Sequence, residues 1–120
     1  IGVRHHAGLT ATAPGFYGAQ SRKIPGFPPR FPDLPDSIAK LGVRNMEMEV
    51  SALFTLASLG QARAGAVCAV YAQRHHNKFI TPAQKSKAEL DCIQAGLRAF
   101  ERLAEMDAWK KKNRKTYWHP

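Results

Sequence analysis

The segment between Glu49 and Gly60 constrains the fold of this 120-residue chain more than any other feature. Its sequence, VSALFTLASL, places apolar side chains around nearly the whole circumference of a helix. A helix that is apolar on all sides needs other elements to cover it. We therefore expect a buried helix that Glu49 opens and that Gly60 ends as the C-cap residue.

Three segments around this helix have the composition of β-strands. Residues 3–12 combine β-branched and small residues and end at the turn signal Ala13-Pro14-Gly15. Residues 43–48 predict a brief second strand. Residues 64–72 (AGAVCAVYA) are continuous and small, which predicts a central strand covered on both faces.

A long segment, residues 15–36, is rich in proline and glycine and is not expected to form regular structure. Its aromatic residues indicate that it packs against another part of the protein, and loops of this length in a compact domain are often functional. At its end, Asp36 and Ser37 predict the N-cap of a short helix over residues 38–41, which Gly42 stops.

Residues 81–84 (TPAQ) predict the start of a long amphipathic helix. Threonine at the N-cap, proline at the first helical position and glutamine two positions later form a capping box. The apolar residues that follow recur every three or four positions, and the helix is expected to run to Trp109. This single apolar stripe consists of Leu90, Ile93, Leu97, Phe100 and Ala104.

The order of these elements is strand, loop, helix, strand, helix, strand, helix. It predicts the α/β class, with a layered sheet and flanking helices. A sheet of about three strands would have exposed edges. Because the chain also opens at Ile1, without a methionine and inside an expected strand, we expect a further portion of sheet to lie N-terminal to it.

The composition also indicates the cellular compartment in which the protein is expected. No apolar run reaches the roughly 18 to 20 residues that span a bilayer, and the first residues do not resemble a signal peptide. We therefore expect a cytoplasmic protein with no membrane partner. Cys68 and Cys92 lie in apolar segments and have no CxxC partner, so both are expected to be buried, reduced thiols.

The formal net charge of +9 suggests an anionic partner. Much of this charge is local, because residues 110–120 contain five cations: Lys110, Lys111, Lys112, Arg114 and Lys115. Such a run is usually a solvated tail. We expect one domain over residues 1–109 and a basic tail over residues 110–120, with no nucleic acid as a partner.

Two carboxylates, Glu47 and Glu49, lie at the expected junction between a strand and the apolar helix. Residues two apart on an extended segment face the same side, so this pair would suit the vicinal hydroxyls of a ribose. The alternative is that an acid near a helix start only complements the helix dipole.

The proline- and glycine-rich loop contains Gln20 and Arg22. A glutamine amide offers a donor and an acceptor, which matches the imide edge of a pyrimidine. A neighbouring guanidinium could hold a carbonyl oxygen that gains negative charge. Arg74 ends the expected central strand, where open α/β sheets place their ligands. The alternative is that all three are polar surface residues.

Two histidine pairs, His5-His6 and His75-His76, raise the question of a metal site. Adjacent residues on a strand point to opposite faces, and no cysteine or carboxylate has a suitable spacing, so no metal is expected. The sequence contains no glycine-rich dinucleotide or P-loop motif and no serine-hydrolase or zinc-protease motif.

Three stretches, in order and at matching spacing, resemble the C-terminal half of nucleoside phosphorylases of the uridine phosphorylase branch. Residues 45–65, NMEMEVSALFTLASLGQARAG, are similar to a signature in which N-x-E-M-E leads into an apolar helix and an R-A-G turn. Residues 8–22 contain the F-Y-x-x-Q-x-R pattern, and residues 64–74 resemble the strand that follows and ends in arginine. The resemblance implies part of a three-layer phosphorylase fold.

The resemblance also implies site residues. Gln20 and Arg22 would bind the uracil edge and stabilise the departing base, with Phe16 packing against it. Glu47, Met48 and Glu49 would form the ribose wall, with Glu49 holding the sugar hydroxyls. The base pocket would be completed by Tyr71, Ala72 and Arg74.

The implied reaction is phosphorolysis of uridine to uracil and ribose 1-phosphate, with phosphate as co-substrate and no cofactor. The family assembles as homo-oligomers, hexamers among them, and its phosphate loops lie in the N-terminal half, so this chain alone is expected to be inactive. Purine-specific relatives have an aspartate where Ala72 and Gln73 stand here, which favours a pyrimidine.

Two alternatives stay open. The chain could be a non-catalytic relative, an interaction module whose basic tail binds an anionic partner. It could also be a phosphorylase with another nucleoside preference, because the proline-rich loop could reshape the base pocket.

Overall fold

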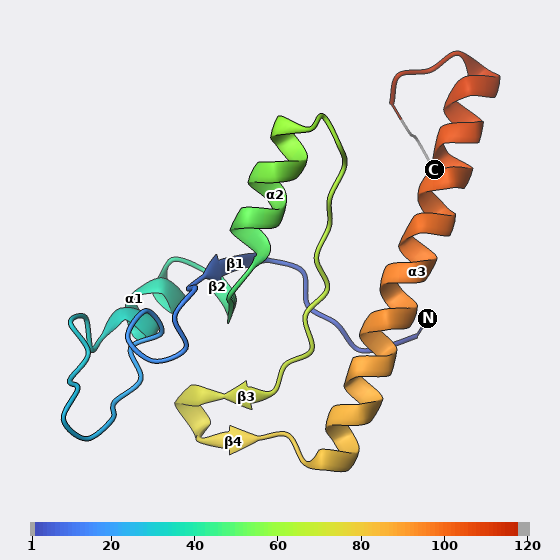
Figure 1. Ribbon diagram of the computed structural model, residues 1–120. Coiled ribbons are helices and arrows are strands. Elements are labelled where there is room, and N and C mark those ends of the chain that lie inside the picture. The colour runs from blue at the N-terminus through green and yellow to red at the C-terminus, as the bar shows by residue number, and fades with distance from the viewer. Residues whose placement is uncertain (1, 118–120) are drawn as a thin grey trace. The chain divides into compact units, whose positions relative to one another are not determined.

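Two separate units make up this computed structural model, which describes residues 2–117. The first unit is Arg4–Ala66, and the second contains residues 67–117 together with residues 2 and 3. Figure 1 shows that both combine helices with a small sheet, which confirms the predicted α/β class.

A pair of parallel strands organises the first unit. Strand β1 (Leu9–Thr12) pairs with β2 (Val43–Glu47), as Figure 1 shows. The register places Thr12 opposite Glu47. Parallel strands need a long crossover connection, which residues 13–42 provide. The strand predicted over residues 3–12 forms only over its last four residues, and the one predicted over residues 43–48 is confirmed to within one residue.

The crossover contains helix α1 (Leu34–Lys40), which begins four residues before the predicted start. The reason is Pro35, whose fixed φ angle is favourable in the first turn of a helix. The helix ends before Gly42, whose φ of 84° is in the left-handed region that glycine tolerates. Residues 15–33 form turns, with one isolated bridge between Ile24 and Phe27, as expected for an irregular segment.

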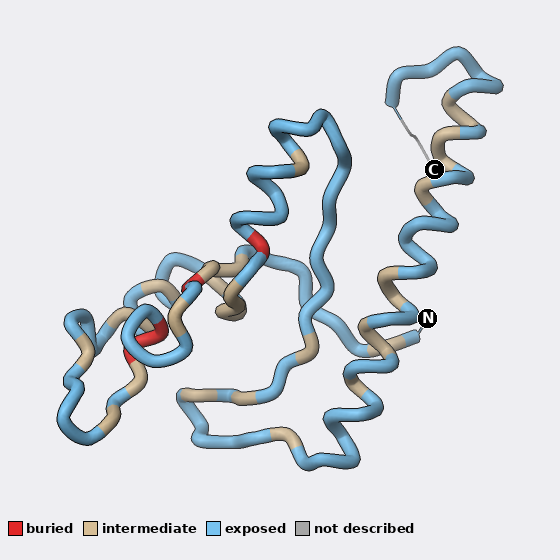
Figure 2. Tube along the Cα trace, in the orientation of Figure 1, coloured by how far each residue is buried: buried red, intermediate tan, exposed pale blue. Residues whose placement is uncertain are grey.

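Helix α2 (Val50–Leu59) has the predicted bounds, with Glu49 as its N-cap residue and Gly60 as its C-cap residue. The prediction that it is buried is wrong for the described chain. Val50 is buried, but Leu56 is 68% exposed and Leu59 is 78% exposed. Figure 2 shows most of α2 as exposed. The physical reason is that β1 and β2 form a sheet of only two strands, which is too small to cover the helix.

The second unit begins without the predicted central strand. Residues 64–71 form no ladder in the described structure, and strand β3 is limited to Ala72–Gln73, which pairs with β4 (Lys78–Phe79) in an antiparallel hairpin. The short 3-10 helix η1 (Arg74–His76) connects them. The carbonyl of Tyr71 accepts the N–H of Ile80 at 2.9 Å, next to the hairpin. A strand persists only where a neighbour takes up its backbone hydrogen bonds, and residues 64–70 enter no ladder in the described structure. Cys68 is therefore exposed, contrary to prediction.

Helix α3 (Pro82–Asn113) follows the hairpin and has the predicted capping box between Thr81 and Gln84. It continues past Trp109, so the first lysines of the predicted tail are helical, while residues 118–120 of that tail lie outside the described residues. Among the residues of α3, Cys92 is half-buried and, like Cys68, is a free thiol. The apolar stripe is open to solvent, with Leu90, Ile93, Leu97 and Phe100 between 53% and 72% exposed. Within the described residues, neither α3 nor any other helix could cross a bilayer.

Candidate nucleoside-binding site

The carboxylate of Glu47 connects the end of the parallel sheet to the start of α2. Its Oε2 accepts hydrogen bonds from the backbone N–H groups of Glu49 (2.7 Å) and Val50 (2.6 Å). Its other oxygen accepts the hydroxyl proton of Thr12. The same Thr12 oxygen accepts the N–H of Ser51 at 2.9 Å. Glu47 and Thr12 thus satisfy the free N–H groups at the start of α2, where no side-chain hydrogen bond from Glu49 caps the helix.

These hydrogen bonds change the acidity of Glu47. Partial desolvation raises the pKa of its carboxyl, but the hydrogen bonds from Thr12, Val50, Glu49 and Thr10 together outweigh this, and the net pKa lies below the ordinary value. Glu47 is therefore ionised at neutral pH, and its negative charge is held at the positive end of α2.

The two predicted ribose-binding carboxylates are in different settings. Glu47 is half-buried and directed at the backbone of α2, whereas Glu49 is exposed at the N-cap position. Met48 lies between them and is half-buried. Of the pair, Glu49 presents its carboxylate to solvent, where a ligand can reach it.

A second cluster forms in the crossover, where three predicted base-binding residues come together. The guanidinium carbon of Arg22 lies 4.0 Å from the centre of the Phe16 ring. Its Nη2 donates to the Oε1 of Gln20 at 3.3 Å, and Gln20 is only 6% exposed. Tyr17 meets Phe16 edge-on, with ring centres 5.1 Å apart. The Nε of Arg22 is buried and has no hydrogen-bond partner among the described residues.

This unsatisfied donor matters because buried polar groups nearly always have a partner. A guanidinium stacked on an aromatic face keeps its plane fixed, so its in-plane N–H groups point in defined directions. Since Arg22 as a whole is half-buried, the cluster can donate hydrogen bonds from guanidinium N–H groups other than the buried Nε to a planar acceptor such as a carbonyl oxygen of a nucleobase.

Ser21, which the sequence interpretation did not single out, fixes the turn between Gln20 and Arg22. It has a left-handed backbone with a φ of 53°, and its hydroxyl donates to the carbonyl of Phe31 at 2.6 Å. The Arg22 N–H donates to the carbonyl of Tyr17 at 2.9 Å. Its place in the sequence, between two proposed ligand-binding residues, is the signal that could have identified it.

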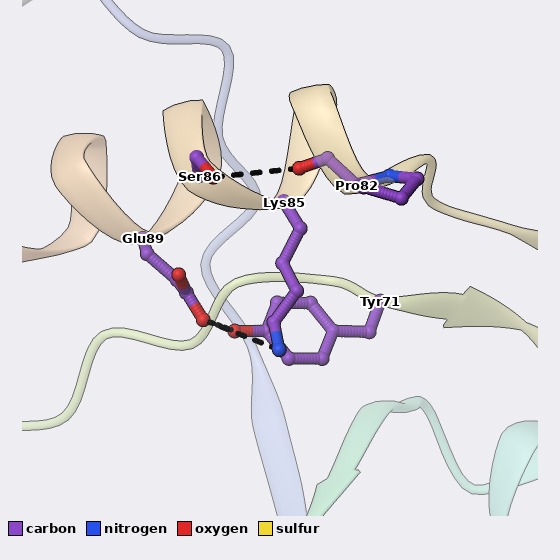
Figure 3. Close-up of polar contacts among 5 residues, drawn as sticks. All are labelled: Tyr71, Pro82, Lys85, Ser86 and Glu89. Atoms are coloured by element: carbon purple, nitrogen blue, oxygen red, sulfur yellow. Dashed lines mark hydrogen bonds and ion pairs between the residues drawn. The ribbon is translucent and has the colours of Figure 1, made fainter.

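The remaining predicted site residues, Tyr71, Ala72 and Arg74, belong to the second unit. Tyr71 lies against the first turns of α3, where its hydroxyl donates to the Oε1 of Glu89 at 2.5 Å and the Nζ of Lys85 lies 5.3 Å from its ring centre (Figure 3). The hydrogen bond to Glu89 raises the pKa of Tyr71, with smaller contributions from desolvation and from the charges of Glu89 and Cys92.

Ala72 and Arg74 occupy the hairpin that follows Tyr71. Ala72 pairs with Phe79 across the hairpin, and Arg74 is half-buried at the start of η1. His75 and His76 are exposed in the same turn. Across residues 2–117, no three histidine, cysteine or acidic side chains gather in a way that could hold a metal ion.

Comparison with known proteins identifies the family of the chain. Residues 1–105 match the sequence model of the phosphorylase superfamily. A uridine phosphorylase of Thermococcus kodakarensis is 40% identical over 122 residues, which cover all of this chain and 42% of that protein. The chain therefore spans less than half the length of this curated relative. No solved structure matches the chain significantly. Because the superfamily model covers most of the chain, this protein belongs to the phosphorylase superfamily.

Proposed function

We propose that this chain supplies the base- and ribose-binding residues of a pyrimidine nucleoside phosphorylase, with uridine as the first candidate substrate. Phosphate would attack C1′ of the nucleoside, the bond from C1′ to the base nitrogen would break, and its electron pair would leave with the base. The relative from Thermococcus kodakarensis, a uridine phosphorylase, supports this assignment.

The observation that carries the proposal is the cluster of Arg22, Gln20 and Phe16. As the glycosidic bond breaks, negative charge develops on the base. The guanidinium of Arg22, fixed by its stacking on Phe16, has a buried N–H without a partner. Donors placed in advance where charge develops lower the barrier of the chemical step. The amide of Gln20 offers the donor and acceptor that the imide edge of uracil requires.

Glu49 would bind the ribose. Its exposed carboxylate can accept hydrogen bonds from vicinal hydroxyl groups, while Met48 would contact the sugar. Glu47 would keep Glu49 in position by accepting hydrogen bonds from the backbone N–H groups of Glu49 and Val50. In this assignment Glu47 positions the ribose site, and Glu49 touches the substrate.

Tyr71, Ala72 and Arg74 would line the base pocket. The absence of an aspartate at positions 72 and 73 removes the acid that would protonate N7 of a purine, which favours pyrimidines. A homo-oligomer in the cytoplasm, with phosphate as co-substrate and no cofactor, completes the proposal.

Phosphate-dependent release of uracil tests this function. The protein at its native length should convert uridine to uracil and ribose 1-phosphate when phosphate is present, and should leave inosine intact. Cleavage of inosine in preference to uridine would support the alternative nucleoside preference. Binding of uracil without any phosphorolysis would support a non-catalytic module. The proposal is contradicted if the protein neither binds uracil nor turns over uridine.

A further inference from the structure

The C-terminal end of α3 concentrates positive charge. Five cations lie between residues 110 and 115, and residues 108–117 contain no acid, so this basic cluster supplies more than half of the net charge of +9. Its members are Lys110, Lys111, Lys112, Arg114 and Lys115. The superfamily match ends at residue 105, before the cluster, whereas the similarity to the uridine phosphorylase of Thermococcus kodakarensis extends over the whole chain.

An ordered helix end carries these cations. The N–H of Lys115 donates to the carbonyl of Lys110 at 3.0 Å, and the N–H of Arg114 donates to that of Lys111 at 3.4 Å. This pair of bonds is the Schellman arrangement that closes a helix. The side-chain amide of Asn113 donates to the carbonyl of Trp109 at 2.8 Å. The charges are therefore held close together, in contrast to those of a flexible tail.

Arg114 has an unfavourable backbone conformation for its residue type. Its φ of 51° and ψ of 42° place it in the left-handed region, at the position of a closing helix that glycine or asparagine normally occupies. A positively charged residue thus occupies a position at which glycine would remove the backbone strain.

Solvent exposure leaves the cluster available to a ligand. Lys111, Lys112, Arg114 and Lys115 are exposed, while Lys110 lies 3.2 Å from the carboxylate of Asp107. Tyr117, directly beyond the cluster, is 75% exposed. Cations that follow one another closely, next to an exposed aromatic ring, match the phosphates and bases of a single-stranded nucleic acid.

We propose that the basic cluster and Tyr117 form a binding surface for single-stranded nucleic acid. Lysine and arginine contact successive phosphates, and the ring of Tyr117 stacks on a base. The surface acts independently of nucleoside phosphorolysis, because none of its residues belongs to the proposed nucleoside site.

Neither the helix dipole nor an anionic membrane accounts for the whole basic cluster. Cations in the last turn of a helix complement its dipole, but Arg114 and Lys115 lie beyond the last turn of α3. An anionic membrane would attract the same lysines. However, Glu101, Glu105 and Asp107 precede the cluster on the same helix and would face the lipid headgroups if α3 lay on the surface.

Fluorescence anisotropy with a labelled oligouridylate of about 10 nucleotides tests the proposal on the whole chain. If all five cations contact phosphates, the affinity should fall about 100-fold between about 50 mM and about 200 mM salt. Neutralising three of them in K111Q/K112Q/K115Q should lower the slope of log affinity against log salt by about 2. The matched control K40Q/K78Q/R98Q removes the same charge from exposed positions elsewhere and should bind like the wild type.

Arg114→Gly separates binding from folding, because it removes a cation and relieves the backbone at once. It should weaken oligonucleotide binding without lowering the thermal midpoint of unfolding. An oligodeoxythymidylate of the same length reports whether the ribose hydroxyl contributes. The proposal is overturned if the control weakens binding as much as the triple variant does. It is equally overturned if the protein binds phosphatidylserine vesicles but not oligonucleotides, or if it binds neither at low salt.

Discussion

Thr12 and Glu47 end neighbouring parallel strands, and the hydroxyl of Thr12 donates a hydrogen bond to the carboxylate of Glu47. Together they receive three backbone N–H groups from the start of α2. The position of Glu49, the carboxylate proposed to bind ribose, therefore depends on a pair of residues whose own polar atoms are engaged within the chain.

Removing the charge of Glu47 should destabilise the fold. Glu47→Gln replaces two hydrogen bonds from backbone N–H groups to a charged acceptor, worth about 1.5–3 kcal/mol each, by bonds to a neutral acceptor worth about 0.5–1.5 kcal/mol each, so the free energy of unfolding should fall by about 2–3 kcal/mol in total. Urea denaturation measures the change. Glu49→Gln is the control, since an exposed side chain should change stability by less than about 0.5 kcal/mol. Equal stability of the two variants would rule out the capping role of Glu47.

The lowered pKa of Glu47 predicts an acid-dependent part of the stability. The unfolded chain binds this proton more readily than the folded chain, so the contribution is complete above the ordinary value near 4.5 and is lost as the pH falls through the folded pKa. The stability difference between wild type and Glu47→Gln should thus shrink below about pH 4. A difference that stays constant from neutral pH to that range would contradict the assignment.

Arg22→Ala should depress turnover of uridine more than it weakens nucleoside binding, because the proposed contact strengthens as charge develops on the base. Loss of one donor of this type typically costs about 100-fold in kcat. Arg22→Lys should restore little, since an ammonium group has no planar face to stack on Phe16. Steady-state kinetics of the native-length protein provide both constants, and an unchanged kcat in Arg22→Ala would remove the leaving-group role.

Glu49→Gln should discriminate between sugars. If its carboxylate accepts hydrogen bonds from the ribose hydroxyls, the loss of kcat/KM should be large for uridine, on the order of 10- to 100-fold for one charged hydrogen bond. The loss should be small for 2′,3′-dideoxyuridine, which lacks those hydroxyls. Equal losses for both nucleosides would place Glu49 outside the ribose site.

The pKa of Tyr71 should change when its hydrogen-bond partner on α3, Glu89, is replaced. Since the hydrogen bond to Glu89 raises the pKa of Tyr71, Glu89→Gln should lower that pKa toward its ordinary value. Ultraviolet titration of tyrosinate formation measures the shift, and subtraction of the Tyr71→Phe curve assigns it. If Glu89→Gln leaves the titration unchanged, the two side chains are not in contact in solution.

Local patterns in the sequence predicted most of the helices and the two strands of the first unit, but not that these strands pair in parallel. The capping box at Thr81 and the apolar run after Glu49 both rest on interactions between near neighbours in the chain, and both helices start where expected. Residues 64–72 have an equally clear composition, but a strand also depends on distant backbone partners. Composition therefore could not indicate that only Ala72 pairs.

In the candidate site, too, features set by near neighbours in the chain could be predicted, and features set by distant residues could not. The motif around Gln20 and Arg22 predicted residues that do lie together, since only a short turn separates them. The expectation that Glu47 and Glu49 face one side assumed an extended backbone through both. In the structure the chain turns into α2 at Glu49, and the free N–H groups of that helix engage Glu47. Thr12 could be identified only from the register of β1 and β2, which joins residues 35 positions apart.

The crossover between β1 and β2 has a consequence for how such proteins diverge. Residues 15–33 of this crossover form turns outside the ladder, so insertions and substitutions there can accumulate without moving Glu47 or Glu49. Because Phe16, Gln20 and Arg22 all belong to that crossover, evolution could retune the recognised base while the sugar contacts stay constant. A library confined to the crossover is therefore the natural starting point for engineering a new base preference on this scaffold.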